Sequence, residues 1–106
     1  MKNITWNDII KEFERAPRDV STVPTTKAVG KWFYVSTSKD DVLVSSGKNH
    51  SNVSKISVAR KLNRYELEDM IDLYLRRKSG ESVSRIAAEK TVNQVYWYGI
   101  FNEMGV

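Results

Sequence analysis

The residues that could carry acid–base, nucleophilic or metal chemistry are few in this sequence of 106 residues. Cysteine is absent, which excludes a thiolate nucleophile, a zinc–thiolate site and a disulfide framework. His50 is the single histidine and lies in a polar GKNHSN segment, which is typical of a solvated loop rather than of a general base. Neither a glycine-rich phosphate loop nor an HExxH zinc helix occurs in the sequence. We therefore predict no catalytic residue, no metal site and no cofactor, and a protein that is not an enzyme.

A cluster of acids between residues 66 and 72 could supply oxygen ligands to a cation. It consists of Glu66, Glu68, Asp69 and Asp72. The spacing matches no calcium loop, and the glycine-centred turn of such a loop is missing. Acids at the start of a helix interact favourably with the helix dipole, so we interpret these four as solvated carboxylates.

Positive charge is unevenly distributed along the chain, whose formal net charge is +4. Residues 48–65 contain five cations and no acid, which creates a sustained positive potential suited to phosphate groups. Residues 76–90 contain five cations and two acids, and the cations at 76–78 also fit the last turn of a helix. Lys55 has a second interpretation, because lysines protect exposed sheet edges from aggregation. The predicted anion-binding residues are Lys48, Lys55, Arg60, Lys61 and Arg64, with Arg76, Arg77, Arg85 and Lys90 as a second contact line.

The segment from Gly80 to Phe101 resembles a helix-turn-helix unit, with a short helix, a break near Lys90 and a second helix. The glycine expected in the turn is missing, and the second helix begins about two residues early for the usual geometry. If the unit binds DNA, the base-reading or interface residues are Asn93, Gln94 and Trp97. The alternative is a plain helical hairpin that packs on the sheet.

The aromatic run YWYGIF supports a second class of function. Tyr96, Trp97, Tyr98 and Phe101 cannot all face one core from a single helix, because neighbouring residues differ by about 100° around the axis. Exposed aromatic residues would suit an interaction module, a regulator or inhibitor of an acidic partner protein, or a homodimer. The third interpretation is that these side chains simply fill the core.

The elements that position these residues predict an α+β fold with a small antiparallel meander of two to three strands. An N-terminal helix begins at Thr5 and ends before Pro17, and residues 18–30 form a loop. The KWFYVST and VLVSS runs form a hairpin around a polar turn, and a third strand covers Val53 to Val58.

Two to three helices follow the meander. The first begins at Asn63 and ends before Gly80, and a short helix opens at Ser82 with Val83, Ile86 and Ala87 inward. Thr91 and Gln94 start a last helix that ends near Gly105, although a strand over residues 92–101 is a serious alternative.

Length and composition predict one globular domain covering residues 1–106, with a hydrophobic content of 41%. The first fifteen residues contain acids and no long apolar run, unlike a signal peptide or a membrane span. We expect a cytoplasmic protein that binds nucleic acid, DNA rather than RNA, or else an acidic protein partner or a second copy of itself, and no membrane.

Overall fold

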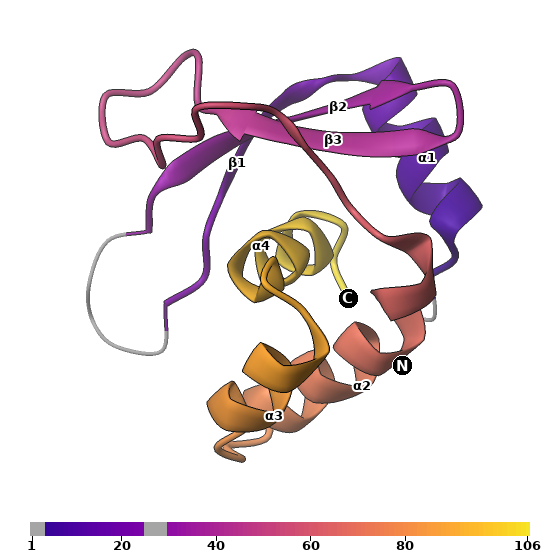
Figure 1. Ribbon diagram of the computed structural model, residues 1–106, viewed down its shortest axis with the longest axis vertical. Coiled ribbons are helices and arrows are strands. Elements are labelled where there is room, and N and C mark those ends of the chain that lie inside the picture. Colours follow the sequence, from indigo (N-terminus) through magenta and orange to yellow (C-terminus); the bar gives the residue numbers. More distant parts are fainter. Residues whose placement is uncertain (1–3, 25–29) are drawn as a thin grey trace.

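The computed structural model describes residues 4–24 and 30–106, and Figure 1 shows how its elements are arranged. An N-terminal helix comes first, an antiparallel sheet in the order β1-β2-β3-β4 follows, and helices complete the chain. The predicted α+β class is confirmed, although the sheet has four strands where the sequence predicts two to three. The elements are α1 Trp6–Arg15, β1 Arg18–Ser21, β2 Trp32–Ser38, β3 Asp41–Ser46, β4 Arg60–Lys61, the 3-10 helix η1 Arg64–Glu66, α2 Leu67–Lys78, α3 Ser84–Lys90 and α4 Gln94–Glu103.

Helix α1 is capped by Thr5, the residue at which the sequence predicts its start, and the cap is a capping box. The hydroxyl of Thr5 accepts a hydrogen bond from the backbone N–H of Asp8 at 3.2 Å, and the Asp8 carboxylate accepts from the N–H of Thr5 at 2.9 Å. The helix buries the face formed by Trp6, Ile9, Ile10 and Phe13. The indole N–H of Trp6 donates to the carbonyl of Asp40 at 2.8 Å, which fixes α1 to the turn between β2 and β3.

The sheet differs from the prediction at both of its edges. Strand β1 lies within the segment predicted as a loop, where four residues are too few to show a periodic pattern but pair with β2 from Arg18↔Val35 to Ser21↔Trp32. Residues 25–29 of that predicted loop lie outside the described residues. The third strand predicted at 53–58 is wrong, because that segment makes one isolated bridge, Trp32↔Val53, and the chain joins the sheet only at β4.

The segments before α2 and α3 confirm most of the predicted helix boundaries. The Asn63 side chain accepts from the N–H of Tyr65 at 3.0 Å, and Gly80, with φ of 100°, follows the end of α2. Val83 and Ala87 of the next segment are buried, but Ile86 is 37% exposed, so its predicted inward orientation is wrong. A seven-residue helix has room for only one narrow buried face.

Residues 94–103 form helix α4, so the strand alternative is excluded. The helix lies between the sheet and α2 (Figure 1), and its residues from Tyr96 to Phe101 are all buried. A helix that is apolar all round has to be covered on more than one side, and two layers cover this one. A Cβ on Gly99 would lie 2.8 Å from the carbonyl oxygen of Ser21 and 2.8 Å from the Phe33 ring, so a glycine allows α4 to approach the sheet this closely.

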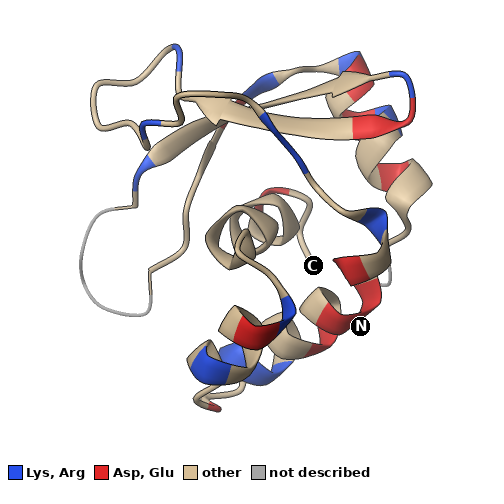
Figure 2. Ribbon diagram, viewed as in Figure 1, with Lys and Arg blue, Asp and Glu red and all other residues tan. Residues whose placement is uncertain are grey.

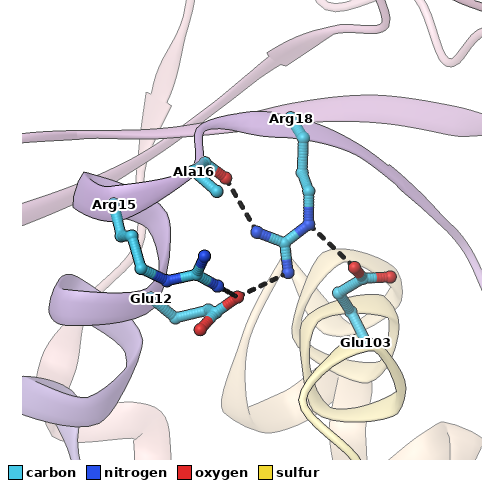
Figure 3. Close-up of polar contacts among 5 residues, drawn as sticks. All are labelled: Glu12, Arg15, Ala16, Arg18 and Glu103. Atoms are coloured by element: carbon cyan, nitrogen blue, oxygen red, sulfur yellow. Dashed lines mark hydrogen bonds and ion pairs between the residues drawn. The ribbon is translucent and has the colours of Figure 1, made fainter.

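Arg18 of β1 links α1 to α4 (Figure 3). Its guanidinium donates to Glu103 of α4 at 2.8 Å, to Glu12 of α1 at 2.8 Å and to the carbonyl of Ala16 at 2.7 Å. The same group lies 4.9 Å from the centre of the Phe13 ring. Hydrogen bonds from Arg18 raise its pKa against the opposing effect of burial, and bonds from Arg15 and Arg18 lower the pKa of the Glu12 carboxyl.

Substituting Arg18→Met is expected to lower the free energy of unfolding by about 1–2 kcal/mol, because the apolar stem remains and the hydrogen-bonding fork is lost. Because Arg18 is partly exposed, we expect this loss of unfolding free energy to lie at the low end of the range for charged hydrogen-bond networks. Arg15→Met is the matched control, since the Arg15 side chain is 69% exposed and Glu12 is its one ion-pair partner among the described residues. Urea unfolding of both variants measures the difference, and equal losses would show that the three-way contact adds nothing.

Candidate nucleic-acid interface

Five of the predicted anion-binding residues follow one continuous segment of the chain. We call Lys48, Lys55, Arg60, Lys61 and Arg64 the cationic strip. Figure 2 shows this segment running from the loop after β3, past the sheet edge at β4, to the start of α2. All five residues are exposed, so their charges are accessible to a ligand.

The first part of the strip is fixed on the outward face of the sheet by a buried carboxylate. Asp19 of β1 is 7% exposed and accepts from the backbone N–H groups of Lys48 at 2.9 Å and Asn49 at 2.8 Å. The Nδ1 atom of His50 lies 2.8 Å from the same carboxylate, and the His50 ring stacks on Trp32 at 3.6 Å between centres. These contacts therefore hold the loop after β3 in a defined conformation, which the polar GKNHSN sequence does not indicate.

The hydrogen bonds to Asp19 have an electrostatic consequence. Burial alone would raise the pKa of this carboxyl, but the bonds from His50 and from the N–H groups of Lys48 and Asn49 stabilise the charged form and lower the pKa below its usual value. The folded state therefore gains stability from the ionised carboxylate at pH values above the unfolded pKa of about 3.9. That contribution is lost as the pH falls from about 4 through the lower folded pKa.

Asp19→Asn is expected to cost about 1–3 kcal/mol of unfolding free energy at neutral pH, because one neutral amide oxygen replaces an acceptor shared by three donors. The difference between wild type and variant should shrink as the pH falls from about 4 through the lower folded pKa of Asp19, because the wild-type carboxylate then loses its charge. Urea unfolding at neutral and at acidic pH tests this. A difference that stays constant with pH would contradict the role assigned to the charged carboxylate.

The cationic strip is poorly neutralised by acids. Lys61 lies 3.5 Å from Asp41, and among the described residues no carboxylate lies within ion-pair distance of the other four cations. Lys48 lies 4.0 Å above the Tyr34 ring, and Arg60 donates to the Asn93 side chain at 3.2 Å and lies 5.7 Å from the Tyr96 ring. Aromatic rings and amides leave the formal charge in place, so the strip keeps a positive potential.

The second contact line lies on α2 and α3, apart from most of the strip (Figure 2), and two of its four cations are paired with acids. Arg76 pairs with Glu81 at 2.6 Å and with Asp72 at 3.6 Å, and Lys90 lies 3.9 Å from Asp69. Arg77 donates to the carbonyl of Val23 and lies 4.9 Å from the Tyr98 ring. Arg85 is exposed and has no ion-pair partner in the described part of the chain. The two predicted groups therefore do not form one continuous contact surface.

The structure corrects the predicted role of the last helix. Trp97 is 0% exposed, and its indole N–H lies 3.3 Å from Glu66, so it cannot reach a ligand in this fold. Asn93 is 8% exposed and binds Arg60, whereas Gln94 is partly exposed at the start of α4. The aromatic residues Tyr96, Tyr98 and Phe101 are also buried, which confirms the core interpretation and removes the exposed aromatic surface predicted for a protein-interaction module.

Sequence reasoning missed one exposed aromatic residue beside the strip. Tyr65 is 86% exposed and directly follows Arg64, whose guanidinium lies 6.0 Å from the Trp6 ring. None of the three residues of the short helix η1 is buried, and Glu66 alone is partly covered, so this turn leaves the Tyr65 ring in solvent. An exposed ring next to unpaired cations can stack on an unpaired base.

The described residues contain no group of three or more histidine, cysteine, aspartate or glutamate side chains that could hold a metal ion. In the same part of the chain, no helix has the length and apolar character needed to cross a bilayer. Comparison with protein-family models, curated proteins and solved structures gave no match.

Proposed function

We propose that this protein is a small non-enzymatic domain that binds nucleic acid, DNA in preference to RNA, through the cationic strip. The observation that carries the proposal is that four of the five strip cations have no carboxylate partner among the described residues while remaining exposed. Exposed, uncompensated cations along one segment can neutralise successive phosphates and release their counterions, which drives association with nucleic acid.

The burial of α4 favours backbone recognition over base reading. A helix-turn-helix protein places its second helix in the major groove, but here that helix lies between the sheet and α2. Phosphate contacts position a protein without reading the sequence. The exposed ring of Tyr65 adds a stacking partner, which favours strands with unpaired bases. The absence of cysteine supports a cytoplasmic setting for this activity.

The alternative partner is an acidic protein or a second copy of the chain. The aromatic side chains that suggested it are buried, so only the charge of the strip supports an acidic partner. If the partner is an acidic protein, this chain should not show the preference for polyphosphate chains that counterion release produces.

Fluorescence anisotropy with labelled single-stranded DNA, duplex DNA and RNA, between about 50 and 200 mM salt, tests the proposal. We expect log affinity to fall linearly with log salt, with a slope near −4.5 on duplex DNA if five phosphates are contacted at ~0.9 each, and a shallower slope near −3.5 on single strands at ~0.7 each. No binding at low salt, or binding that salt does not weaken, would overturn it.

A further inference from the structure

A cavity of about 390 Å³ lies where the end of β1, the start of β2 and the three C-terminal helices meet. Arg77 and Lys31 contribute two cations to its lining, and none of its described lining residues is acidic. The volume lies within the range of small-molecule sites, at their lower end. A cavity of this size with two cations and no carboxylate suits a small anion.

Tyr98 supplies a buried hydrogen-bonding group that the protein leaves unused. The residue is 4% exposed and lines the cavity, and its hydroxyl is the single buried side-chain polar atom without a hydrogen-bond partner in the described part of the chain. A buried polar group without a partner costs about 1–3 kcal/mol. Burial raises the pKa of Tyr98, and nearby Arg77 only partly offsets this, so the phenol is a neutral donor at physiological pH.

The start of α4 brings two more free donors to the same place. Gln94 and Val95 line the cavity, and their backbone N–H groups have no acceptor among the described residues. Asn93 occupies the cap position but does not cap the helix, because its side-chain oxygen accepts from Arg60. Gln94, Val95 and Tyr98 lie on one face of α4 and all line the cavity, so the positive end of the helix dipole and the Tyr98 side chain belong to one wall.

Arg77 is held in place at this wall. Its guanidinium donates to the carbonyl of Val23 and lies 4.9 Å from the centre of the Tyr98 ring. A cation held by one hydrogen bond and one aromatic face keeps most of its N–H groups for a further acceptor. Arg77, unlike Arg76, has no acid partner among the described residues.

We propose that the cavity binds a phosphate monoester, with the N–H groups at the start of α4, the Arg77 guanidinium and the Tyr98 hydroxyl as its donors. A free mononucleotide and the 5′-phosphate end of a nucleic-acid strand present the same group. Ser54 lines the cavity and Lys55 follows it, so the cationic strip passes the site. A free nucleotide would bind in the cavity alone. The end of a strand would also contact the cationic strip, so this version of the proposal rests on the proposed function.

Tyr98→Phe gives the test a signature that a merely structural role would not produce. Removal of an unpartnered buried hydroxyl should leave the unfolding free energy of the free protein unchanged or raised. The same change should weaken phosphate binding about tenfold, because a hydrogen bond to a charged group is lost. Tyr74→Phe is the matched control, since Tyr74 is buried beside Tyr98 but does not line the cavity. Lys31→Gln provides a second, exposed variant that should also weaken binding.

Calorimetric titration with adenosine 5′-monophosphate, and with otherwise identical oligonucleotides carrying a 5′-phosphate or a 5′-hydroxyl, distinguishes the two sources. Nucleotide binding that depends on Tyr98 supports a free ligand, and a preference for 5′-phosphorylated ends that depends on Tyr98 supports a strand end. The proposal is overturned if the protein neither binds the nucleotide nor prefers 5′-phosphorylated ends. It is also overturned if Tyr98→Phe leaves the binding unchanged. Neutralising the cationic strip should weaken the binding of all oligonucleotides but leave mononucleotide binding unchanged. The experiment therefore tests the strip as the nucleic-acid interface separately from the cavity as the phosphate site.

Discussion

Replacing Gly99 with alanine is expected to destabilise this protein, although the same change stabilises an ordinary helix by about 1 kcal/mol. The added Cβ would lie 2.8 Å from the backbone oxygen of Ser21 and 2.8 Å from the Phe33 ring. A backbone oxygen within a strand cannot move as a flexible side chain can, so α4 has to shift away from the sheet. Overpacking of this kind costs about 1–3 kcal/mol, which leaves a net loss of up to about 2 kcal/mol. Gly99→Val should cost more, because it adds bulk and lowers helix propensity.

The control for Gly99 is Asn102→Ala on the exposed side of the same helix, where the change should remain within about 0.5 kcal/mol. Urea unfolding with linear extrapolation measures all three variants. If Gly99→Ala stabilises the protein as it would an isolated helix, the close approach of α4 to the sheet is incorrect.

Neutralising three residues of the strip is expected to abolish most nucleic-acid affinity. The triple variant that combines Lys55→Gln, Lys61→Gln and Arg64→Gln loses three phosphate contacts. Each contact contributes about tenfold at 0.1 M salt, so we expect a loss of roughly two to three orders of magnitude. The fold should be unaffected, because the three side chains are exposed.

The matched control combines Arg76→Gln, Arg85→Gln and Lys90→Gln, which removes the same formal charge from α2 and α3. Two of these residues already pair with acids, so affinity should fall less than about tenfold through the weaker general field. Anisotropy titrations of both triple variants give the comparison. Equal losses would show that net charge, and not the strip, determines binding.

Local sequence signals predicted the elements that local interactions form. The Thr5 and Asp8 capping box, the polar turn of the hairpin and the left-handed Gly80 each act within a few residues of the chain. Strand β1 has no such signal, because its four residues are ordered by pairing with β2. The burial of α4 on two sides depends on where the sheet and α2 lie, so the sequence offered the core interpretation of its aromatic residues only as one of several.

The candidate interface was predictable in its residue types but not in its electrostatics. The acid-free run identified the strip, and only the fold shows that Lys61 alone meets a carboxylate while Arg76 meets two. The Asp19 anchor joins groups about thirty residues apart, and such a contact leaves no periodic trace in a sequence. The prediction that Trp97 reads bases was wrong for the same reason: its burial depends on residues that are distant in the sequence.

Amide chemical-shift mapping of the ¹⁵N-labelled protein with a single-stranded DNA of about 12 nucleotides tests the central claim most directly. We predict that the largest shifts occur at residues 48–65 and that they reverse as the salt concentration rises. Shifts concentrated at residues 76–90, or the absence of any shift at low salt, would contradict the assignment of the cationic strip as the nucleic-acid interface.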